Sequence, residues 1–132
     1  MMQASRKNPS LELLPLKGSF TIHRLHPDRE IPGIITGFHS VTRTNDDISI
    51  VCLDEVEIDS EERSPGWKCL KVSGPLELDL VGILHDLSKP LKEAGISIFS
   101  ISTYTTDYLL VPGSSYERAI EVLSTEYKIM PT

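Results

Sequence analysis

The sequence predicts an α+β fold made of two ferredoxin-like units, the first of which is a degenerate copy. Two observations support this prediction. From residue 67 onward the elements follow the order strand, helix, strand, strand, helix, strand, which is the split βαβ arrangement of the ferredoxin-like fold. The two halves of the chain also share a weak repeat. A chain of 132 residues has room for one domain or for two very small ones.

Short β-rich runs separated by turn-forming residues fill the first half of the chain. Asn45, Asp46 and Asp47 separate two of these runs and predict a hairpin. This half contains no convincing first helix, and for that reason its unit is expected to be degenerate. The predicted strands are residues 11–16, 19–25, 34–42 and 48–53.

Two helices are predicted in the second half. The first begins at Gly82, because apolar residues then recur at helical spacing, and it ends before Gly95. Pro90 is expected to kink this helix, or to lie where a carbonyl is already free. The second helix is expected to begin at Ser114, with Glu117 completing a capping box. The predicted strands are residues 67–72, 76–80, 96–102, 107–111 and 127–130.

The acidic segment at residues 54–66 is predicted to be a solvated connection between the halves, because it ends in the turn-forming pair Pro65–Gly66. The expected organisation is therefore a disordered leader at residues 1–10, a degenerate unit at residues 11–64 and a complete unit at residues 65–132. The second unit alone is too small to bury a large core. It is expected to pack on the first.

A shift of 61 positions aligns the two predicted hairpins with each other. Six positions then match within 13 residues, which is consistent with two related halves. Strand–turn–strand segments share composition, so the match is suggestive rather than decisive. The matched pairs are Phe38 with Phe99, Thr42 with Thr103, Thr44 with Thr105, Asp46 with Asp107, Ile48 with Leu109, and Ile50 with Val111.

The charge balance argues against a nucleic-acid partner and against an anionic membrane surface. The chain has 19 acidic and 13 basic residues, which gives a net charge of −6. The polar first ten residues lack the apolar core of a signal peptide, and no apolar run approaches the ~20 residues of a membrane span. The expected compartment is the cytoplasm.

No pattern in the chain indicates a catalytic or metal site. Cys52 and Cys69 lie in apolar, strand-like runs and are expected to be buried hydrophobic residues without a disulfide. The histidines and cysteines lack metal-ligand spacing, and the P-loop, GxGxxG and GxSxG motifs are absent from the sequence. His85–Asp86 resembles a phosphohydrolase dipeptide, but that chemistry needs further metal ligands on helices. No cofactor, metal or catalytic residue is expected.

The string ISIFSISTYTTDYLLV at residues 96–111 resembles the ACT domain, a small amino-acid-sensing module. It is most similar to the tandem-ACT group related to the regulatory part of aspartate kinases and to the CASTOR arginine sensors. Further matching segments lie at residues 38–44, 47–51, 66–72 and 80–84, so the resemblance covers about residues 15–125. It implies two ACT-type units that bind a small ligand at the interface between units and that pair as a homodimer.

The chemistry of an α-amino acid suggests which residues bind it. Its carboxylate needs backbone N–H donors, and Gly82, flanked by Val81 and Ile83, lies at a strand-to-helix turn where such donors are free. Asp107 offers an anion for the ammonium group. Two neutral alternatives remain open: Gly82 serves only to open the helix, and Asp107 is only a hairpin residue.

The resemblance extends this site to further positions. It implies that Thr103, Tyr104, Thr106 and Asp107 line the ligand, and that Ser40–Val41 contributes main-chain contacts from across the interface. The arginine sensors of this group carry a second aromatic residue in this turn, where this chain has Thr106. That departure argues against a preference for arginine.

The favoured hypothesis is therefore a non-enzymatic regulatory protein that binds an amino acid or a similar metabolite. The alternative is a protein-interaction module whose ancestral ligand site is vestigial. An acylphosphatase-type hydrolase ranks lower, because its chemistry needs an anion-binding loop with a fixed arginine and the arginines here are scattered. An RNA-binding module is weaker still, given the net charge.

Overall fold

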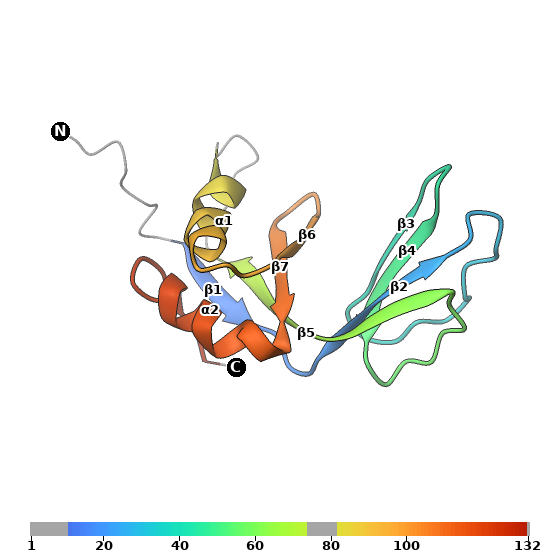
Figure 1. The fold of residues 1–132 in the computed structure, drawn as a ribbon, viewed down its shortest axis with the longest axis horizontal. Helices are drawn as coiled ribbons and strands as arrows, with labels where there is room; N and C mark the ends of the chain where they lie inside the picture. The colour runs from blue at the N-terminus through green and yellow to red at the C-terminus, as the bar shows by residue number, and fades with distance from the viewer. Residues whose placement is uncertain (1–10, 74–81, 132) are drawn as a thin grey trace. The chain divides into compact units, whose positions relative to one another are not determined.

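The computed structural model describes residues 11–73 and 82–131, and its chain divides into two compact units (Figure 1). Unit 1 comprises residues 11–17 together with the chain from residue 69 onward, and unit 2 comprises residues 18–68. This division differs from the predicted boundary between residues 64 and 65. The predicted leader at residues 1–10 and the predicted strand at residues 76–80 lie outside the described residues.

Unit 1 contains the predicted ferredoxin-like order, which confirms the α+β fold class. Strand β5 (Glu62–Ser73) is followed by α1, β6, β7, α2 and β8. Its sheet has the strand order β8-β1-β5-β7-β6. The further bounds are β1 (Glu12–Pro15), α1 (Ile83–Glu93), β6 (Phe99–Ser102), β7 (Asp107–Pro112), a 3-10 turn (Gly113–Ser115), α2 (Tyr116–Leu123) and β8 (Lys128–Ile129).

Strand β1 is an addition to the ferredoxin-like pattern. It pairs antiparallel with β5, with Leu13 opposite Val72, and parallel with β8, with Leu13 opposite Ile129. It therefore lies between two strands that both come from the second half of the sequence. Because Leu13 is only 1% exposed, this short strand belongs to the core of unit 1 and not to a separate N-terminal unit.

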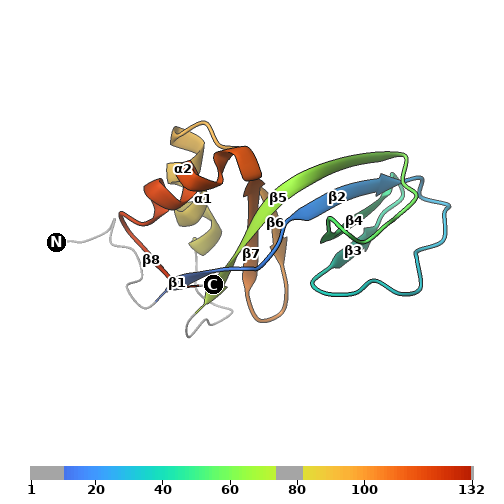
Figure 2. The ribbon, with the colours of Figure 1, turned by 90° about the horizontal axis from the view of Figure 1, so that it is seen from below.

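Both helices lie against one face of the unit 1 sheet (Figure 2). Their apolar side chains recur at i and i+4, the spacing that places residues on one helix face. Burying each large aliphatic side chain contributes roughly 1.5–3 kcal/mol. The buried residues of this core are Leu11, Leu13, Leu70, Val72, Leu87, Leu91, Ile96, Leu109, Val111, Ala119, Leu123 and Tyr127.

Unit 2 is an antiparallel sheet with the strand order β3-β4-β2-β5, to which β5 contributes its first part. Residues 18–68 contain no helix, so this unit departs from the ferredoxin-like pattern further than the missing first helix predicted. Its buried core is Leu25, Ile48, Ile50, Cys52 and Ile58. The bounds are β2 (Phe20–Leu25), β3 (Ser40–Arg43) and β4 (Ile48–Leu53).

Strand β5 begins at Glu62, so the prediction of a loop through residue 66 was wrong. Phe20 pairs with Trp67 and Ile22 with Ser64, which means that β5 uses one residue more than β2 over this stretch. The extra residue is a β-bulge, and Gly66 takes the positive φ of 82° that such a bulge permits. The Pro65–Gly66 pair thus interrupts the ladder without ending the strand.

A partly buried polar contact accompanies this bulge. The Asp54 carboxylate accepts a hydrogen bond from the Thr21 hydroxyl at 2.6 Å and one from the Gly66 N–H at 3.3 Å. The carboxylate therefore supplies a partner for a backbone group near the point where the strand ladder shifts register.

Two further predictions were wrong. Strand β3 begins at Ser40 and not at residue 34, because Gly37 with its φ of 77° breaks the extended run. Helix α2 begins at Tyr116, after a 3-10 turn, and no side chain caps its start. The predicted capping box at Ser114 is therefore absent. Among the helices of the described residues, none is long and apolar enough to cross a membrane.

Candidate functional site

Gly82 stands immediately before helix α1 in the left-handed conformation, with φ 81° and ψ 9°. Its carbonyl accepts the Asp86 N–H at 2.8 Å, which closes the first turn of the helix. The N–H groups of a first helical turn have no partner within the helix. Apart from its chain neighbours, no described residue has an atom within 4 Å of a Cβ added at Gly82.

The hairpin turn between β6 and β7 carries the other predicted residues of unit 1. The Thr103 hydroxyl accepts the N–H groups of Thr105 and Thr106, at 3.3 and 3.2 Å, and donates to the Thr106 carbonyl at 3.1 Å. These bonds use all the donor and acceptor positions of a hydroxyl group. The hydrogen bonds of the Thr103 hydroxyl therefore stabilise the turn.

Thr106 is buried, with 8% of its surface exposed, and its hydroxyl donates to the Val72 carbonyl on β5. Tyr104, at the tip of the turn, is 80% exposed. Asp107 is half-buried at the start of β7 and lies opposite Ser102. Thr103 is exposed as well, but of the predicted hairpin residues Tyr104 and Asp107 are those whose side chains take no part in the turn bonds given above and still have exposed surface.

The predicted site residues do not all fall in one unit. Six of them belong to unit 1, whereas Ser40 and Val41 form the start of β3 in unit 2, and Val81 lies outside the described residues. The six in unit 1 are Gly82, Ile83, Thr103, Tyr104, Thr106 and Asp107.

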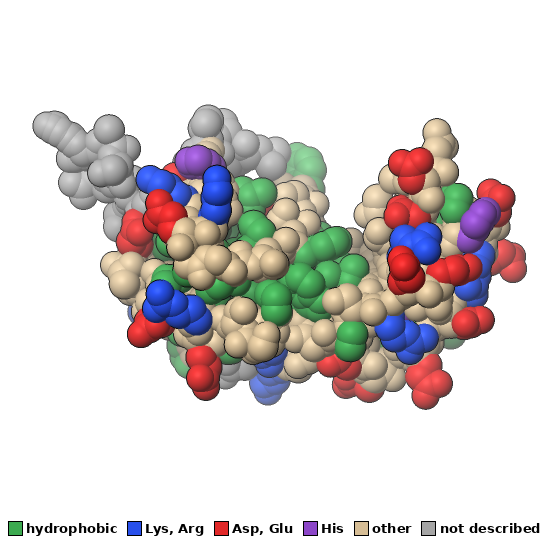
Figure 3. All heavy atoms as spheres, viewed as in Figure 1, with side chains coloured by type: hydrophobic (Ala, Val, Ile, Leu, Met, Phe, Trp, Pro, Cys, Tyr) green, Lys and Arg blue, Asp and Glu red, His purple; other side chains and the backbone are tan. Residues whose placement is uncertain are grey.

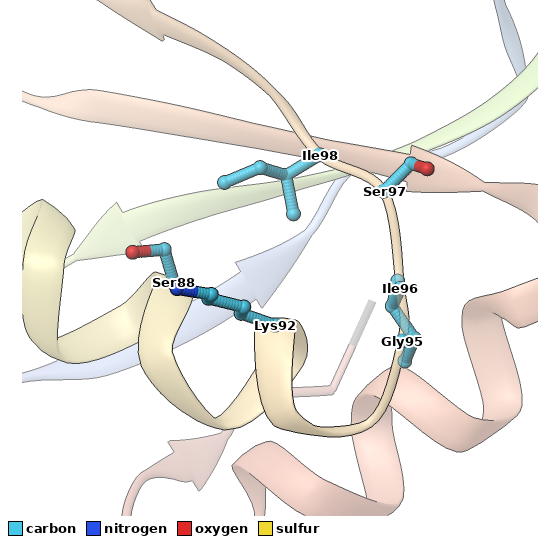
Figure 4. A pocket seen from close by; sticks show the side chains of 6 residues that line it. All are labelled: Ser88, Lys92, Gly95, Ile96, Ser97 and Ile98. Carbon is cyan, nitrogen blue, oxygen red and sulfur yellow. The ribbon is translucent and has the colours of Figure 1, made fainter.

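A hollow of about 430 Å³ in unit 1 was missed by sequence reasoning (Figure 4). Ser88 and Lys92 of α1 form one side of it, and the segment Gly95–Ile98, which follows the helix, forms the other. Figure 4 shows the Lys92 side chain running along α1 toward Ser88, with the Ile98 side chain facing the helix and the Ser97 hydroxyl turned away. The Ser88 hydroxyl donates to the His85 carbonyl at 3.1 Å.

The sequence held a signal for this hollow that was misinterpreted. Residues 96–98 alternate in polarity and were predicted to begin a strand, but β6 begins only at Phe99. Ile96 is buried and Ile98 is half-buried. The segment therefore borders the helix instead of extending the sheet ladder.

Burial governs the pKa values of the cysteines. Desolvation raises the pKa of the Cys69 thiol to about 12 and also raises that of Cys52, where the neighbouring Asp54 charge adds to the effect. Both thiols are free and buried, as predicted. A thiol with a raised pKa is a poor nucleophile, because the thiolate is the reactive form. Within residues 11–73 and 82–131, no three His, Cys, Asp or Glu side chains cluster as metal ligands would.

His23 on β2 is the buried histidine of unit 2. It is only 2% exposed, its Nδ1 lies 2.8 Å from the Ser60 hydroxyl, and its Nε2 has no hydrogen-bond partner. Burial lowers the pKa of this imidazole, and the Arg63 charge lowers it further. The neutral form is therefore the stable one in the folded chain.

Similarity to known proteins agrees with this architecture. A family model of the ACT domain matches residues 62–125, and a model of a separate N-terminal domain matches residues 18–67. A crystal structure of a protein from Agobacterium tumefaciens is 37% identical, has a TM-score of 0.85 and covers 93% of this chain and 94% of that one. The fold and these matches define a small ACT-domain protein.

The chain belongs to the ACT-domain family. The human cytosolic arginine sensor for mTORC1 subunit 1 is 40% identical over 58 residues, which cover 43% of this chain and 18% of the sensor. The chain thus spans less than a fifth of the length of the curated arginine sensors that it matches. The aspartate kinase of Clostridium acetobutylicum shares the fold at 14% identity, with a TM-score of 0.66 over 88% of this chain and 34% of the kinase.

Proposed function

We propose that this chain is a non-enzymatic regulatory protein that binds an amino acid beside the start of helix α1. The observation that carries the proposal is the left-handed Gly82 at the start of α1, where no described residue beyond its chain neighbours fills the place of an added Cβ. Free N–H groups and the positive end of the helix dipole suit a carboxylate at this place. Asp107 would hold the ammonium group, and Ser40 with Val41 would complete the site from across an interface.

Similarity supports the class of ligand without identifying it. One relative is named an arginine sensor, and a structural neighbour is titled an allosteric enzyme of amino-acid production. We propose a ligand other than arginine for this chain. An aromatic side chain at position 106 would lose the bond from Thr106 to Val72 and would need space in a buried site. In our proposal Tyr104, not residue 106, supplies the aromatic contact.

A thermal-shift screen against the twenty amino acids and common polyamines tests this proposal. A ligand at 100 times its Kd adds about 2.7 kcal/mol, which raises the Tm of a domain of this size by several degrees. The shift is expected to disappear in Asp107→Asn and to persist in Asp46→Asn, which changes an exposed carboxylate in the other hairpin turn.

A second variant tests the role of the helix start. Gly82→Ala adds a methyl group that no described residue beyond the chain neighbours would meet, but it strains the positive φ. We expect weaker ligand binding in this variant. If no compound in the panel raises the Tm, the amino-acid proposal fails for that panel.

The second candidate is an interaction module with a vestigial ligand site. It is favoured by the hydroxyls of Thr103 and Thr106, because both already form hydrogen bonds within the protein. If the screen finds no ligand while the chain binds a protein surface, this candidate replaces the first.

A further inference from the structure

Ile34 is a strongly exposed aliphatic side chain in the loop between β2 and β3 of unit 2. It is 85% exposed, and Ile31 in the same loop is 37% exposed. Among the described residues, Tyr104 is the only other large apolar side chain with comparable exposure. Leaving an isoleucine in water is unfavourable, and contact with an apolar surface would remove that cost.

Hydrogen bonds and ion pairs hold the start of this loop, at Pro27 and Arg29. The Arg43 guanidinium at the end of β3 donates to the carbonyls of Pro27 and Arg29, the latter at 3.1 Å. The Arg29 guanidinium in turn contacts the carboxylates of Asp59 and Glu61, at 3.5 and 3.1 Å. Because its start is anchored, the loop loses less conformational entropy on binding than an unanchored segment would.

The hollow beside α1 in unit 1 is lined in part by apolar residues, so it can receive an exposed aliphatic side chain. Of the described residues that line it, Gly95, Ile96 and Ile98 are apolar, Ser88 and Ser97 are polar, and Lys92 is charged. Its volume of about 430 Å³ is ample for one aliphatic side chain. Figure 3 shows hydrophobic side chains on the visible face of unit 1 between α1 and the β6–β7 hairpin, with charged side chains around α1 itself. Charged side chains of both signs also lie on the visible face of unit 2.

The charges on the Ile34 loop and at the hollow indicate which occupant fits. The loop that carries Ile34 also carries the exposed Glu30, and Lys92 lies at the hollow that would receive it. A loop with an exposed isoleucine and, four positions earlier, an exposed glutamate is thus matched with a largely apolar hollow that a lysine lines. Opposite charges at the rim of a contact favour the right partner and the right register.

We propose that the Ile34 loop of one copy of this chain inserts into the hollow beside α1 of a second copy, with Glu30 facing Lys92. The occupant is thus unit 2 of another identical chain. One such contact is smaller than a standard stable interface, so the association depends on protein concentration. Its ion pair is exposed to solvent, so the association also weakens as salt rises.

Sedimentation velocity of the full chain over a range of concentrations tests this contact, in the absence of any added amino acid. Ile34→Asp and Lys92→Glu are each expected to raise the dissociation constant at least tenfold. Ile34→Leu, which stays apolar, and Lys89→Glu, which changes an exposed lysine on the same helix outside the hollow, are expected to leave it unchanged.

A charge exchange makes the test specific to the proposed pair. Lys92→Glu combined with Glu30→Lys is expected to restore most of the association that Lys92→Glu removes. Chains that stay monomeric at every concentration overturn the proposal, and so does an association that Ile34→Asp leaves intact. A charge exchange without restoration also overturns it. The altered side chains lie on the surface, and an unchanged Tm and far-UV circular dichroism spectrum confirm that each variant folds.

This contact does not require a ligand. If the chain associates through Ile34 but no amino acid raises its Tm, the contact is supported and the amino-acid proposal fails. A chain that binds an amino acid but stays monomeric gives the opposite result.

Discussion

The β3–β4 hairpin of unit 2 and the β6–β7 hairpin of unit 1 have turns of the same kind. Thr44 accepts the N–H groups of Asp46 and Asp47 at 3.1 and 3.2 Å, just as Thr103 accepts two N–H groups of its own turn. Each threonine N–H also donates to the carbonyl three residues later, at 2.9 Å in unit 2 and 2.8 Å in unit 1. The two turns thus have the same hydrogen-bond pattern over four residues, although most of their residues differ.

The strand registers show which positions correspond. Arg43 pairs with Ile48 in one hairpin, and Ser102 pairs with Asp107 in the other, which is an offset of 59 residues. The sequence repeat indicated an offset of 61. Side chains on a strand alternate between its faces, so an error of two residues leaves the polarity pattern intact. Thr44 therefore corresponds to Thr103 and not to Thr105.

The fourth turn position distinguishes the hairpins. In unit 1 this residue is the buried Thr106, whose hydroxyl bonds to β5, and in unit 2 it is the half-buried Asp47. The turn threonine is common to both and is explained by the turn. A ligand-specific role is therefore more credible for positions that differ between the hairpins, such as Tyr104 and Asp107, than for Thr103.

The largest expected effect tests the equivalence of the two hairpins in their cores. Ile50 and Leu109 correspond at the offset of 59 and are 0% and 1% exposed. Replacing either with alanine removes buried methyl groups and is expected to cost about 2–5 kcal/mol of unfolding free energy. Ser49→Ala, next to Ile50 but on the opposite face of β4, is expected to cost far less.

Urea denaturation with two probes measures these effects by unit. Trp67, the single tryptophan, reports on unit 2, and helical circular dichroism reports on unit 1, because every helix of the described chain lies there. If one alanine variant loses several kcal/mol and the other loses almost nothing, the two hairpins do not contribute equally to their units.

Much of unit 1 was predictable because its signals are local. Apolar residues at helical spacing identified α1, and Gly95 marked its end with a φ of 73°. Gly82, in the left-handed conformation, likewise stands at the predicted start of α1, whereas the strand predicted before it lies outside the described residues. These features depend on neighbouring residues, which a single sequence displays directly.

The features that were missed depend on partners distant in sequence. β1 lies between β5 and β8, and its own residues give no sign of that position. Pro65–Gly66 resembled a loop because only the pairing with β2 turns it into a bulge. The hollow beside α1 was missed for the same reason, because it exists only where Gly95–Ile98 borders the helix.

A smaller expected effect tests the difference at the fourth turn position. Thr106→Val keeps the shape of the side chain but leaves the Val72 carbonyl without its donor. An unsatisfied buried carbonyl costs about 1–3 kcal/mol. Asp47→Ala, at the corresponding position of the other hairpin, is expected to change stability by less than about 0.5 kcal/mol, as substitutions away from buried features usually do.

The same urea titrations measure this pair of variants. If Thr106→Val destabilises unit 1 and Asp47→Ala leaves unit 2 unchanged, the fourth turn position contributes to stability in unit 1 alone. Equal losses would contradict it, because the bond from Thr106 to β5 would then add nothing to the shared turn.

The smallest expected effect is a pH dependence confined to unit 2. Burial, with a further contribution from Arg63, lowers the pKa of His23 in the folded chain below its unfolded value of about 6.5. The unfolded chain therefore binds the proton more readily. The stability contributed by neutral His23 is complete above pH 6.5 and is lost as the pH falls from there toward the lowered pKa.

Unit 1 supplies the contrast for this prediction, because its single histidine, His85, is exposed. Urea midpoints followed by Trp67 fluorescence are expected to fall between pH 7.5 and pH 5.5, while the midpoint from helical circular dichroism changes less. His23→Gln, which carries no titrating proton, is expected to flatten the fluorescence profile over this range. A profile that stays steep in that variant would assign the loss to carboxylates such as Glu61 and not to the buried imidazole. Desolvation acts to raise the pKa of Glu61, but backbone hydrogen bonds and the Arg29 contacts together lower it.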